Sequence, residues 1–354
     1  MNFIKKYLVK KAQKKDLQLT EAVLRNDVEA INRFVKPSFF VRGADVNGVR
    51  WLKRPLHEAA EKGYVECVKA LLDHGADGKL LAQDGSAPIH TAIHYDKDRV
   101  VGVLADAGYL ETTNMMDQTP LHVCMEVHNA KLAKILLEKG ANTEAKDTFN
   151  QTILNDTAMN GYYEGVDLLL KYGANVEAVN LGGVLYNGYA DSVELLLKHG
   201  ADVMKRNAIN DTLLHILATS DCSSRVADEK GHSLEVTLKM LLEYGADINA
   251  KNDKGDTPLH IACKTHNVKM VKNLLNHGAD EMVVNNDGQN PLNIAARSQD
   301  VQTIQLLLNL GDAYRKSPVS PSVQPIQIIR SSENNEHMTV LFKNIQNEER
   351  GFYG

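Results

Sequence analysis

A cysteine and a histidine ten positions apart are the residues of this chain that most resemble a nucleophile and its base. Cys222 and His232 lie in the stretch ATSDCSSRVADEKGHS, with carboxylates at Asp221, Asp228 and Glu229. A thiolate nucleophile needs a histidine held beside it, a partner that orients that histidine, and donors for the oxyanion. Whether this stretch meets those needs depends on the elements that flank it.

Segments of similar sequence recur along the chain and define those elements. Three close copies begin at Arg54, Thr119 and Thr257 and read RPLHEAAEKGYVECVKALLDHGAD, TPLHVCMEVHNAKLAKILLEKGAN and TPLHIACKTHNVKMVKNLLNHGAD. Weaker copies begin at Ala87, Thr152, Thr212 and Asn290. The step from Thr257 to Asn290 is 33 residues. The repeated segment resembles the ankyrin repeat, and the resemblance covers roughly residues 17–313.

The resemblance implies an all-α ankyrin-repeat solenoid of about nine helix-pair units joined by hairpin loops. In each copy we expect the threonine to cap the first helix, and proline is tolerated in a first helical turn. A histidine such as His260 is expected to hydrogen-bond between neighbouring repeats. Gly278 is expected to end the second helix with a positive φ. One repeat cannot bury its own apolar face, so stability depends on stacked neighbours.

Two repeats depart from the regular length. The hairpin before Gly188 is short by about six residues, whereas the repeat that begins at Thr212 has twelve extra residues between its helices, at about 219–232. Their polar character and Gly231 predict a surface loop. Cys222 and His232 then sit on a loop without a catalytic scaffold, and we predict that the protein is not an enzyme. The alternative is an effector enzyme with a Cys/His site in the 219–232 insertion or in the C-terminal segment.

The remaining cysteines and histidines have structural interpretations. Cys67, Cys124 and Cys263 fall where the repeat places small apolar core residues. No spacing typical of a metal site and no phosphate-binding glycine loop occurs, so no cofactor is predicted. The net charge of −5 gives no general attraction to nucleic acid, which we do not expect as a partner. The repeat's histidine position holds His57, His90, His122, His215 and His260.

A concave face made of hairpin tips and the exposed sides of first helices is the binding surface that the resemblance implies. Those positions are unusually rich in aromatic residues and methionine in the N-terminal two-thirds of the chain, and aromatic anchors dominate binding energy. The sequence therefore predicts a protein partner, bound by Trp51, Lys53, His94, Tyr95, Met115, Met116, Val127, Phe149, Met159 and Tyr186.

The two ends differ from the repeats. Residues 1–16 form a basic N-terminal leader, for which contact with an anionic membrane is the less favoured alternative to a solvated segment. Residues 314–354 form a polar tail that contains proline and serine. Its glutamates and the chain's composition resemble ankyrin-repeat effectors of Legionella type, which implies a cytoplasmic protein secreted into the host cell cytosol by a bacterial secretion system. A eukaryotic cytosolic adaptor is the alternative.

Overall fold

The computed structural model describes residues 2–37, 43–49, 53–219 and 234–314. Eighteen α-helices in these ranges form nine consecutive pairs, and the same ranges hold no β-strand beyond one isolated bridge between Lys146 and Thr152. The predicted all-α class with about nine helix pairs is confirmed. Among these helices none has the length and apolar character needed to cross a membrane.

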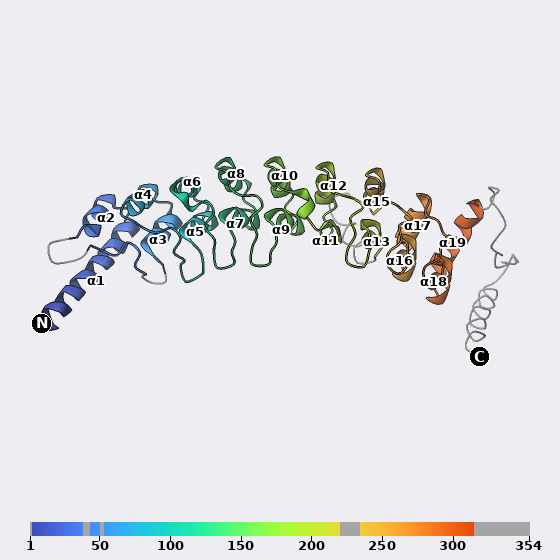
Figure 1. Cartoon of the computed structure of the whole chain (residues 1–354), viewed down its shortest axis with the longest axis horizontal. Coiled ribbons are helices and arrows are strands. Elements are labelled where there is room, and N and C mark those ends of the chain that lie inside the picture. The colour runs from blue at the N-terminus through green and yellow to red at the C-terminus, as the bar shows by residue number, and fades with distance from the viewer. Residues whose placement is uncertain (1, 38–42, 50–52, 220–233, 315–354) are drawn as a thin grey trace. The chain divides into compact units, whose positions relative to one another are not determined.

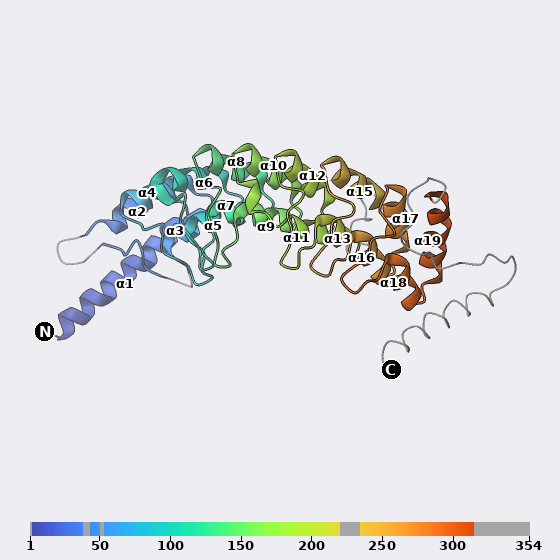
Figure 2. The same ribbon diagram turned by 45° about the vertical axis from the view of Figure 1, so that its right-hand side comes forward.

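The helices belong to two compact units, residues 1–184 with 189–202 and residues 185–188 with 203–354. Figures 1 and 2 show that α3, α5, α7 and α9 of unit 1 lie in one row and α4, α6, α8 and α10 in another. The helices of unit 1 are α1 (Asn2–Leu24), α2 (Val28–Val35), α3 (Pro55–Lys62), α4 (Val65–Asp73), α5 (Pro88–His94), α6 (Asp98–Leu104), α7 (Pro120–Glu126), α8 (Ala130–Glu138), α9 (Ile153–Met159), α10 (Tyr163–Lys171) and α12 (Ala190–Lys198).

Unit 2 repeats the same arrangement. Its first helices α13, α16 and α18 follow one another, as do its second helices α15, α17 and α19 (Figure 1). The bounds are α13 (Leu213–Leu217), α15 (Leu234–Glu243), α16 (Pro258–Lys264), α17 (Val268–Asn276), α18 (Pro291–Arg297) and α19 (Val301–Tyr314). The sequence predicts an insertion at residues 219–232. Residue 219 is described by the structure, and residues 220–232 lie outside the described residues.

The basic leader predicted at residues 1–16 has no structural boundary at its end. Helix α1 runs without interruption from Asn2 to Leu24. Its later residues Leu19, Ala22 and Val23 are buried. The first repeat therefore begins within a helix that the leader shares.

A histidine side chain takes part in the cap of four first helices, α5, α7, α13 and α16. In α7, α13 and α16 the backbone N–H of Thr119, Thr212 and Thr257 donates to Nδ1 of the histidine three residues later, at 3.1 Å in each case. The threonine hydroxyl lies 2.8–2.9 Å from the same nitrogen. The predicted threonine cap is part of this arrangement, because the threonine and histidine side chains of each pair form a capping box. Thr152, which is followed by Asn155 instead of histidine, does cap its helix.

Glycines end the second helices as predicted. Gly75, Gly140, Gly173 and Gly278 have φ between 82° and 88°, the left-handed region that other residues adopt only with strain. After each glycine the chain folds back on the helix: Ala76 N–H donates to Leu71 O at 2.9 Å. The glycine therefore turns the chain into the next hairpin.

The sixth repeat has no room for a hairpin. A 3-10 turn, η2 (Val176–Ala178), leads almost directly into α11 (Leu181–Tyr186). Helix α11 contains Gly182 and Gly183, and a Cβ on Gly183 would lie 2.9 Å from Met159 Sδ and 2.8 Å from Asn180 Nδ2. Glycine thus permits the close approach of α9, although it weakens a six-residue helix.

We predict that backbone amides of residues 176–188 exchange with solvent faster than those of residues 257–278. Each glycine inside α11 costs roughly 1 kcal/mol of helix stability relative to alanine, so local opening is easier there. Hydrogen exchange followed by mass spectrometry on the full chain measures both segments together. Equal protection of the two segments would contradict the prediction.

Candidate partner-binding surface

Two neighbouring hairpin tips of unit 1 expose large apolar side chains. Met115 and Phe149 are 70% and 69% exposed, and Met116 is also exposed. Backbone hydrogen bonds link successive tips: Met115 N–H donates to Gly85 O at 3.0 Å, and Thr148 N–H donates to Met116 O at 3.1 Å. Met116 and Phe149 are therefore held on adjoining tips. We call Met115, Met116 and Phe149 the tip cluster.

The end of α5 adds an aromatic side chain. Tyr95 is exposed directly after α5, and Lys53 Nζ lies 5.9 Å from the centre of its ring. Lys53 also forms an ion pair with Glu61 of α3. The hydrogen bond to Glu61 is the main cause of the raised pKa of Lys53. The ammonium group is thus held charged between the carboxylate and the ring.

The other predicted surface residues have varied settings. His94 and Val127 are exposed at the ends of α5 and α7, whereas Met159 is half-buried against Gly183. Tyr186 is exposed but its residue is assigned to unit 2. Trp51 lies outside the described residues. The structure therefore brings together the tip cluster, and it leaves Tyr186 in a different unit.

Unit 2 also exposes apolar side chains. Ile209, Met282 and Val284 in its hairpins are at least as exposed as Met116. The apolar surface was predicted for the N-terminal two-thirds of the chain, and Met282 and Val284 lie beyond it, whereas Ile209 lies within it but was not among the predicted residues. The alternation of apolar and polar residues in these hairpins was the feature of the sequence that indicated their exposure.

Four repeat histidines connect neighbouring repeats, as predicted. The Nε2 atoms of His57, His90, His215 and His260 lie 2.9–3.1 Å from a backbone carbonyl oxygen of the next repeat. Because Nδ1 accepts from a backbone N–H in three of these repeats, the proton of the neutral ring is on Nε2, which donates.

His122 does not make this connection. Its Nδ1 accepts the Thr119 N–H, so Nε2 carries the proton, yet Nε2 is buried without a hydrogen-bond partner among the described residues. The corresponding carbonyl of the next repeat is that of Gln151, which accepts from Asp147 N–H just as the Gln118 carbonyl accepts from Asn114 N–H. Burial lowers the pKa of His122 to about 4, and the negative charge of Asp147 opposes that shift. The ring is therefore neutral near pH 7.

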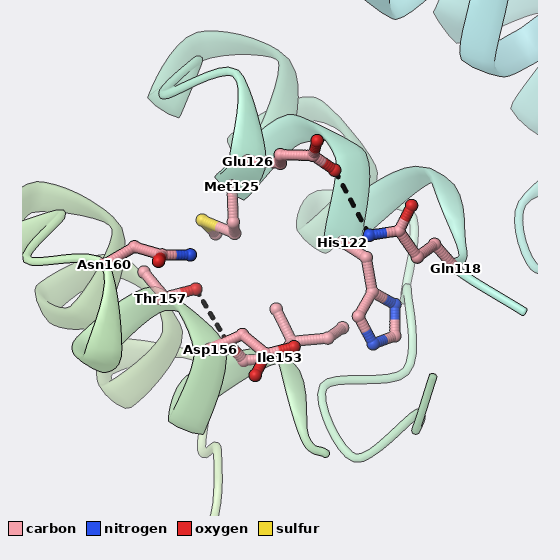
Figure 3. Close-up of a pocket in the computed structure, with 8 residues that line it drawn as sticks. All are labelled: Gln118, His122, Met125, Glu126, Ile153, Asp156, Thr157 and Asn160. Carbon is pink, nitrogen blue, oxygen red and sulfur yellow. Dashed lines mark hydrogen bonds between the residues drawn. The ribbon is translucent and has the colours of Figure 1, made fainter. Parts of the chain in front are cut away.

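A pocket of about 210 Å³ lies at this position between α7 and α9 (Figure 3). Figure 3 shows the His122 ring and the Asn160 side chain at opposite ends, with Ile153 and Asp156 along one side. Gln118 Nε2 donates to Glu126 Oε2 at 3.1 Å on the other side. The lining residues are Gln118, His122, Met125, Glu126, Ile153, Asp156, Thr157 and Asn160.

Asp156 is an unusual carboxylate. Burial raises its pKa to about 6, the charge of Asp147 adds to the rise, and a hydrogen bond with Asn155 opposes it. The same position after the histidine holds Glu58 and Thr91 in two repeats and the apolar residues Val123, Ile216, Ile261 and Ile294 in others. The sequence analysis did not predict this pocket, although Ile153 in place of proline and Asn155 in place of histidine indicate an irregular repeat.

The described cysteines do not form a nucleophilic site. Cys67, Cys124 and Cys263 are buried, as predicted, and burial raises the pKa of the Cys67 thiol to about 11 and of the Cys263 thiol to about 12. These thiols are therefore protonated near pH 7. No group of histidine, cysteine and acidic side chains suited to a metal occurs within the part of the chain that the structure describes. Cys222 and His232 lie outside it.

Comparisons with known proteins agree with the repeated helix pairs. The family model described as "Ankyrin repeats (3 copies)" matches residues 19–114, 105–180 and 225–317. An ankyrin repeat protein of fowlpox virus is 33% identical over 134 residues, which cover 36% of this chain and 30% of that protein. The mouse B-cell lymphoma 3 protein homolog is 31% identical over 178 residues, 48% of this chain and 39% of that protein. The aligned regions thus span less than half of each relative.

A solved structure supports the same fold. The crystal structure of the ankyrin repeat domain of Bcl-3, described as a member of the IkappaB protein family, matches with a TM-score of 0.52 and 27% identity. The match covers 59% of this chain and 94% of that domain.

Exchanging His90 and His122 separately for asparagine should have unequal effects on the free energy of unfolding. Asn293 occupies the same position in α18 and accepts the Asn290 N–H through Oδ1, so asparagine preserves the helix cap. His90→Asn also removes the hydrogen bond to Gln118 O, whereas His122→Asn removes none between repeats. We expect His90→Asn to cost about 1 kcal/mol more. Urea unfolding at pH 7.5 measures the difference, and equal losses would contradict it.

Replacing Asp156 by asparagine should stabilise the protein at pH 7.5. The carboxyl has a higher pKa folded than unfolded, so its ionised form destabilises the fold above pH 6, and this penalty fades as pH falls below 6. Partial exposure limits the expected gain at pH 7.5 to about 1–2 kcal/mol. Thermal unfolding between pH 5 and 8 measures it.

Asp98→Asn is the matched control for that measurement. The hydrogen bond from Lys131 lowers the pKa of Asp98, so loss of this carboxylate should not stabilise the protein at pH 7.5. If Asp98→Asn raised the stability at pH 7.5 as much as Asp156→Asn, the stabilisation would come from the change in net charge and not from the burial of Asp156.

Proposed function

The chain belongs to the ankyrin-repeat family, and we propose that it is a non-catalytic scaffold that binds one partner protein through the tip cluster. Ankyrin repeats form protein–protein interaction scaffolds, and the matched regions cover more than two thirds of this chain. The observation that carries the proposal is the exposure of Met115, Met116 and Phe149 on adjoining tips. Large apolar side chains gathered on a surface mark interaction sites.

The tip cluster has the features of a binding hot spot. Backbone hydrogen bonds fix each tip to the one before it, so little ordering is needed when a partner binds. Tyr95 and Lys53 provide an aromatic and charged group at the end of α5. Aromatic and methionine anchors of this kind contribute most of the energy of protein interfaces.

The predicted effector role and the enzyme alternative depend on the sequence alone. The effector role and secretion into a host cytosol rest on residues 314–354, and the enzyme alternative rests on Cys222 and His232 or on the C-terminal segment. Residues 315–354 and both members of that pair lie outside the described residues. Four further statements are also predictions from the sequence: a cytoplasmic location, a host protein as partner, the absence of a nucleic-acid partner and the role of Trp51 in binding.

Photocrosslinking from the tip cluster tests the proposed surface. We expect p-benzoylphenylalanine in place of Phe149 to form a discrete covalent adduct with one protein in cells that produce the full chain. The matched control places the same residue at Tyr172, an exposed aromatic position at the end of α10 in the other helix row. Equal adducts from both positions, or none from Phe149, would contradict the proposal.

Alanine variants then measure the energetics with the partner so identified. The double variant Met116→Ala/Phe149→Ala should weaken binding by about thirtyfold or more, since truncating a hot-spot side chain costs about 2 kcal/mol. Tyr163→Ala/Tyr172→Ala, which removes two exposed aromatics from α10 and its end, should bind like wild type. Isothermal titration calorimetry measures both variants after circular dichroism confirms their fold.

A further inference from the structure

Two carboxylates that solvent can reach line the pocket between α7 and α9. Glu126 is exposed at the end of α7, and Asp156 of α9 is half-buried. Figure 3 shows them on opposite sides of the pocket, whose apolar lining includes Met125 and Ile153. The described lining residues include no lysine or arginine. The pocket therefore has a negative group on each side and no cationic side chain in its described wall.

The position of Gln118 holds a cation in another repeat. In the second repeat Lys53 forms an ion pair with Glu61, which corresponds to Glu126 by repeat register. Gln118 takes the place of Lys53, and its Nε2 donates to Glu126 Oε2 at 3.1 Å. The eighth repeat also has an ion pair at these two positions, with the charges exchanged, between Asp256 and Lys264. A neutral amide donates a hydrogen bond but leaves the charge of Glu126 uncompensated.

Asp156 is likewise without a counter-ion. Among the residues that the structure describes, no ion pair includes Asp156. Burial raises the pKa of its carboxyl to about 6, and the charge of Asp147 adds to that rise. At pH 7.5 the carboxylate is therefore ionised in surroundings that disfavour its charge. A cation placed beside it would relieve that cost.

Other classes of ligand match this lining less well. The two carboxylates repel an anion. An apolar group leaves both negative charges uncompensated. No group of three acidic, histidine or cysteine side chains suited to a metal ion occurs within the described ranges, so a divalent metal ion lacks the ligands that it needs. Lysine and arginine carry a positive head on an aliphatic stem, which can lie along apolar groups while the head meets a carboxylate.

We propose that this pocket receives a lysine or arginine side chain of the partner protein. The cationic head pairs with Asp156, and Glu126 attracts it from the opposite side of the pocket. The stem lies along Met125 and Ile153. This assignment rests on the proposed function, because the partner supplies the side chain.

The location and size of the pocket agree with such an occupant. Gln118 lies at the base of the hairpin whose tip carries Met115 and Met116, and Ile153 begins the helix that follows the Phe149 tip. A protein seated on the tip cluster therefore has the pocket beside it. The volume of about 210 Å³ is far above the roughly 10–15 Å³ that a single water needs.

Small-molecule probes test the pocket in the full chain without the partner. The methyl groups of methionine and isoleucine are labelled with ¹³C, and NMR follows the Met125 and Ile153 signals during titration at pH 7.5 with N-acetyllysine methylamide or N-acetylarginine methylamide. We expect saturable shifts of both signals with a dissociation constant of about 1–10 mM. The norleucine and glutamine analogues lack the charge and should bind about threefold more weakly or less tightly still. The tighter of the two cationic probes identifies the preferred head group.

Three variants assign the charge that binds the cationic probes. Asp156→Asn removes the carboxylate with little change of shape and should weaken their binding about three- to tenfold, with no effect on the norleucine analogue. Glu126→Gln keeps an acceptor for Gln118 and should weaken it about twofold. Glu138→Gln is the matched control, because it removes an equal charge from α8 in the other helix row, where Glu138 pairs with Lys134. This control should leave the affinity unchanged.

Three results would overturn the proposal. These are binding of an uncharged analogue as tight as that of the cationic probes, shifts that do not saturate with either cationic probe, and equal affinity of the Asp156→Asn and wild-type proteins for these probes. Because the probes need no partner, such a result leaves crosslinking from Phe149 intact. Conversely, failure of the crosslinking together with saturable binding of a cationic probe would remove the proposed surface and keep a site for a cationic side chain.

Discussion

The histidine in the first turn of five of the nine described first helices is the residue on which the regular stack depends. One imidazole caps its own helix through Nδ1 and reaches the next repeat through Nε2, as in His90 and His260. A repeat of two short helices cannot bury its apolar face alone, so the contact between repeats provides much of the stability. The histidine joins both levels of structure because its two nitrogens act in different repeats. Burial favours the neutral ring that this role needs, since it lowers the pKa of both histidines.

The same constraint explains why an irregularity becomes a pocket. Where the following repeat has Ile153 and Asp156, His122 retains its cap but loses its connection to the next carbonyl. A hollow with polar walls then remains between two helices that elsewhere pack directly. The repeat tolerates this locally because each repeat contacts only its neighbours and the loss is not transmitted along the array.

Much of the fold follows from the sequence because the repeat's residue types have local physical roles. Gly278 follows a second helix where the chain turns with positive φ, and Cys124 fills a buried apolar position of the repeat. Exposure of Met115 and Phe149 could be predicted since the repeat register fixes which side chains the stack covers. The capping role of His122 and the close approach of Met159 to Gly183 could not, because both depend on atomic contacts that residue types do not fix. The first contact joins Thr119 and His122 at the start of α7, and the second joins residues of different helices.

The proposed surface has the physical character of one that binds strongly and selects weakly. Burial of Met116 and Phe149 is favourable for any apolar surface of suitable shape, so it discriminates little between partners. Backbone hydrogen bonds hold the tips together, so binding there would require little ordering. Selectivity would have to come from polar groups beside the tips, because a partner that fails to pair with such groups leaves them unsatisfied. Lys53 is one such group, since its ammonium is held between Glu61 and the ring of Tyr95.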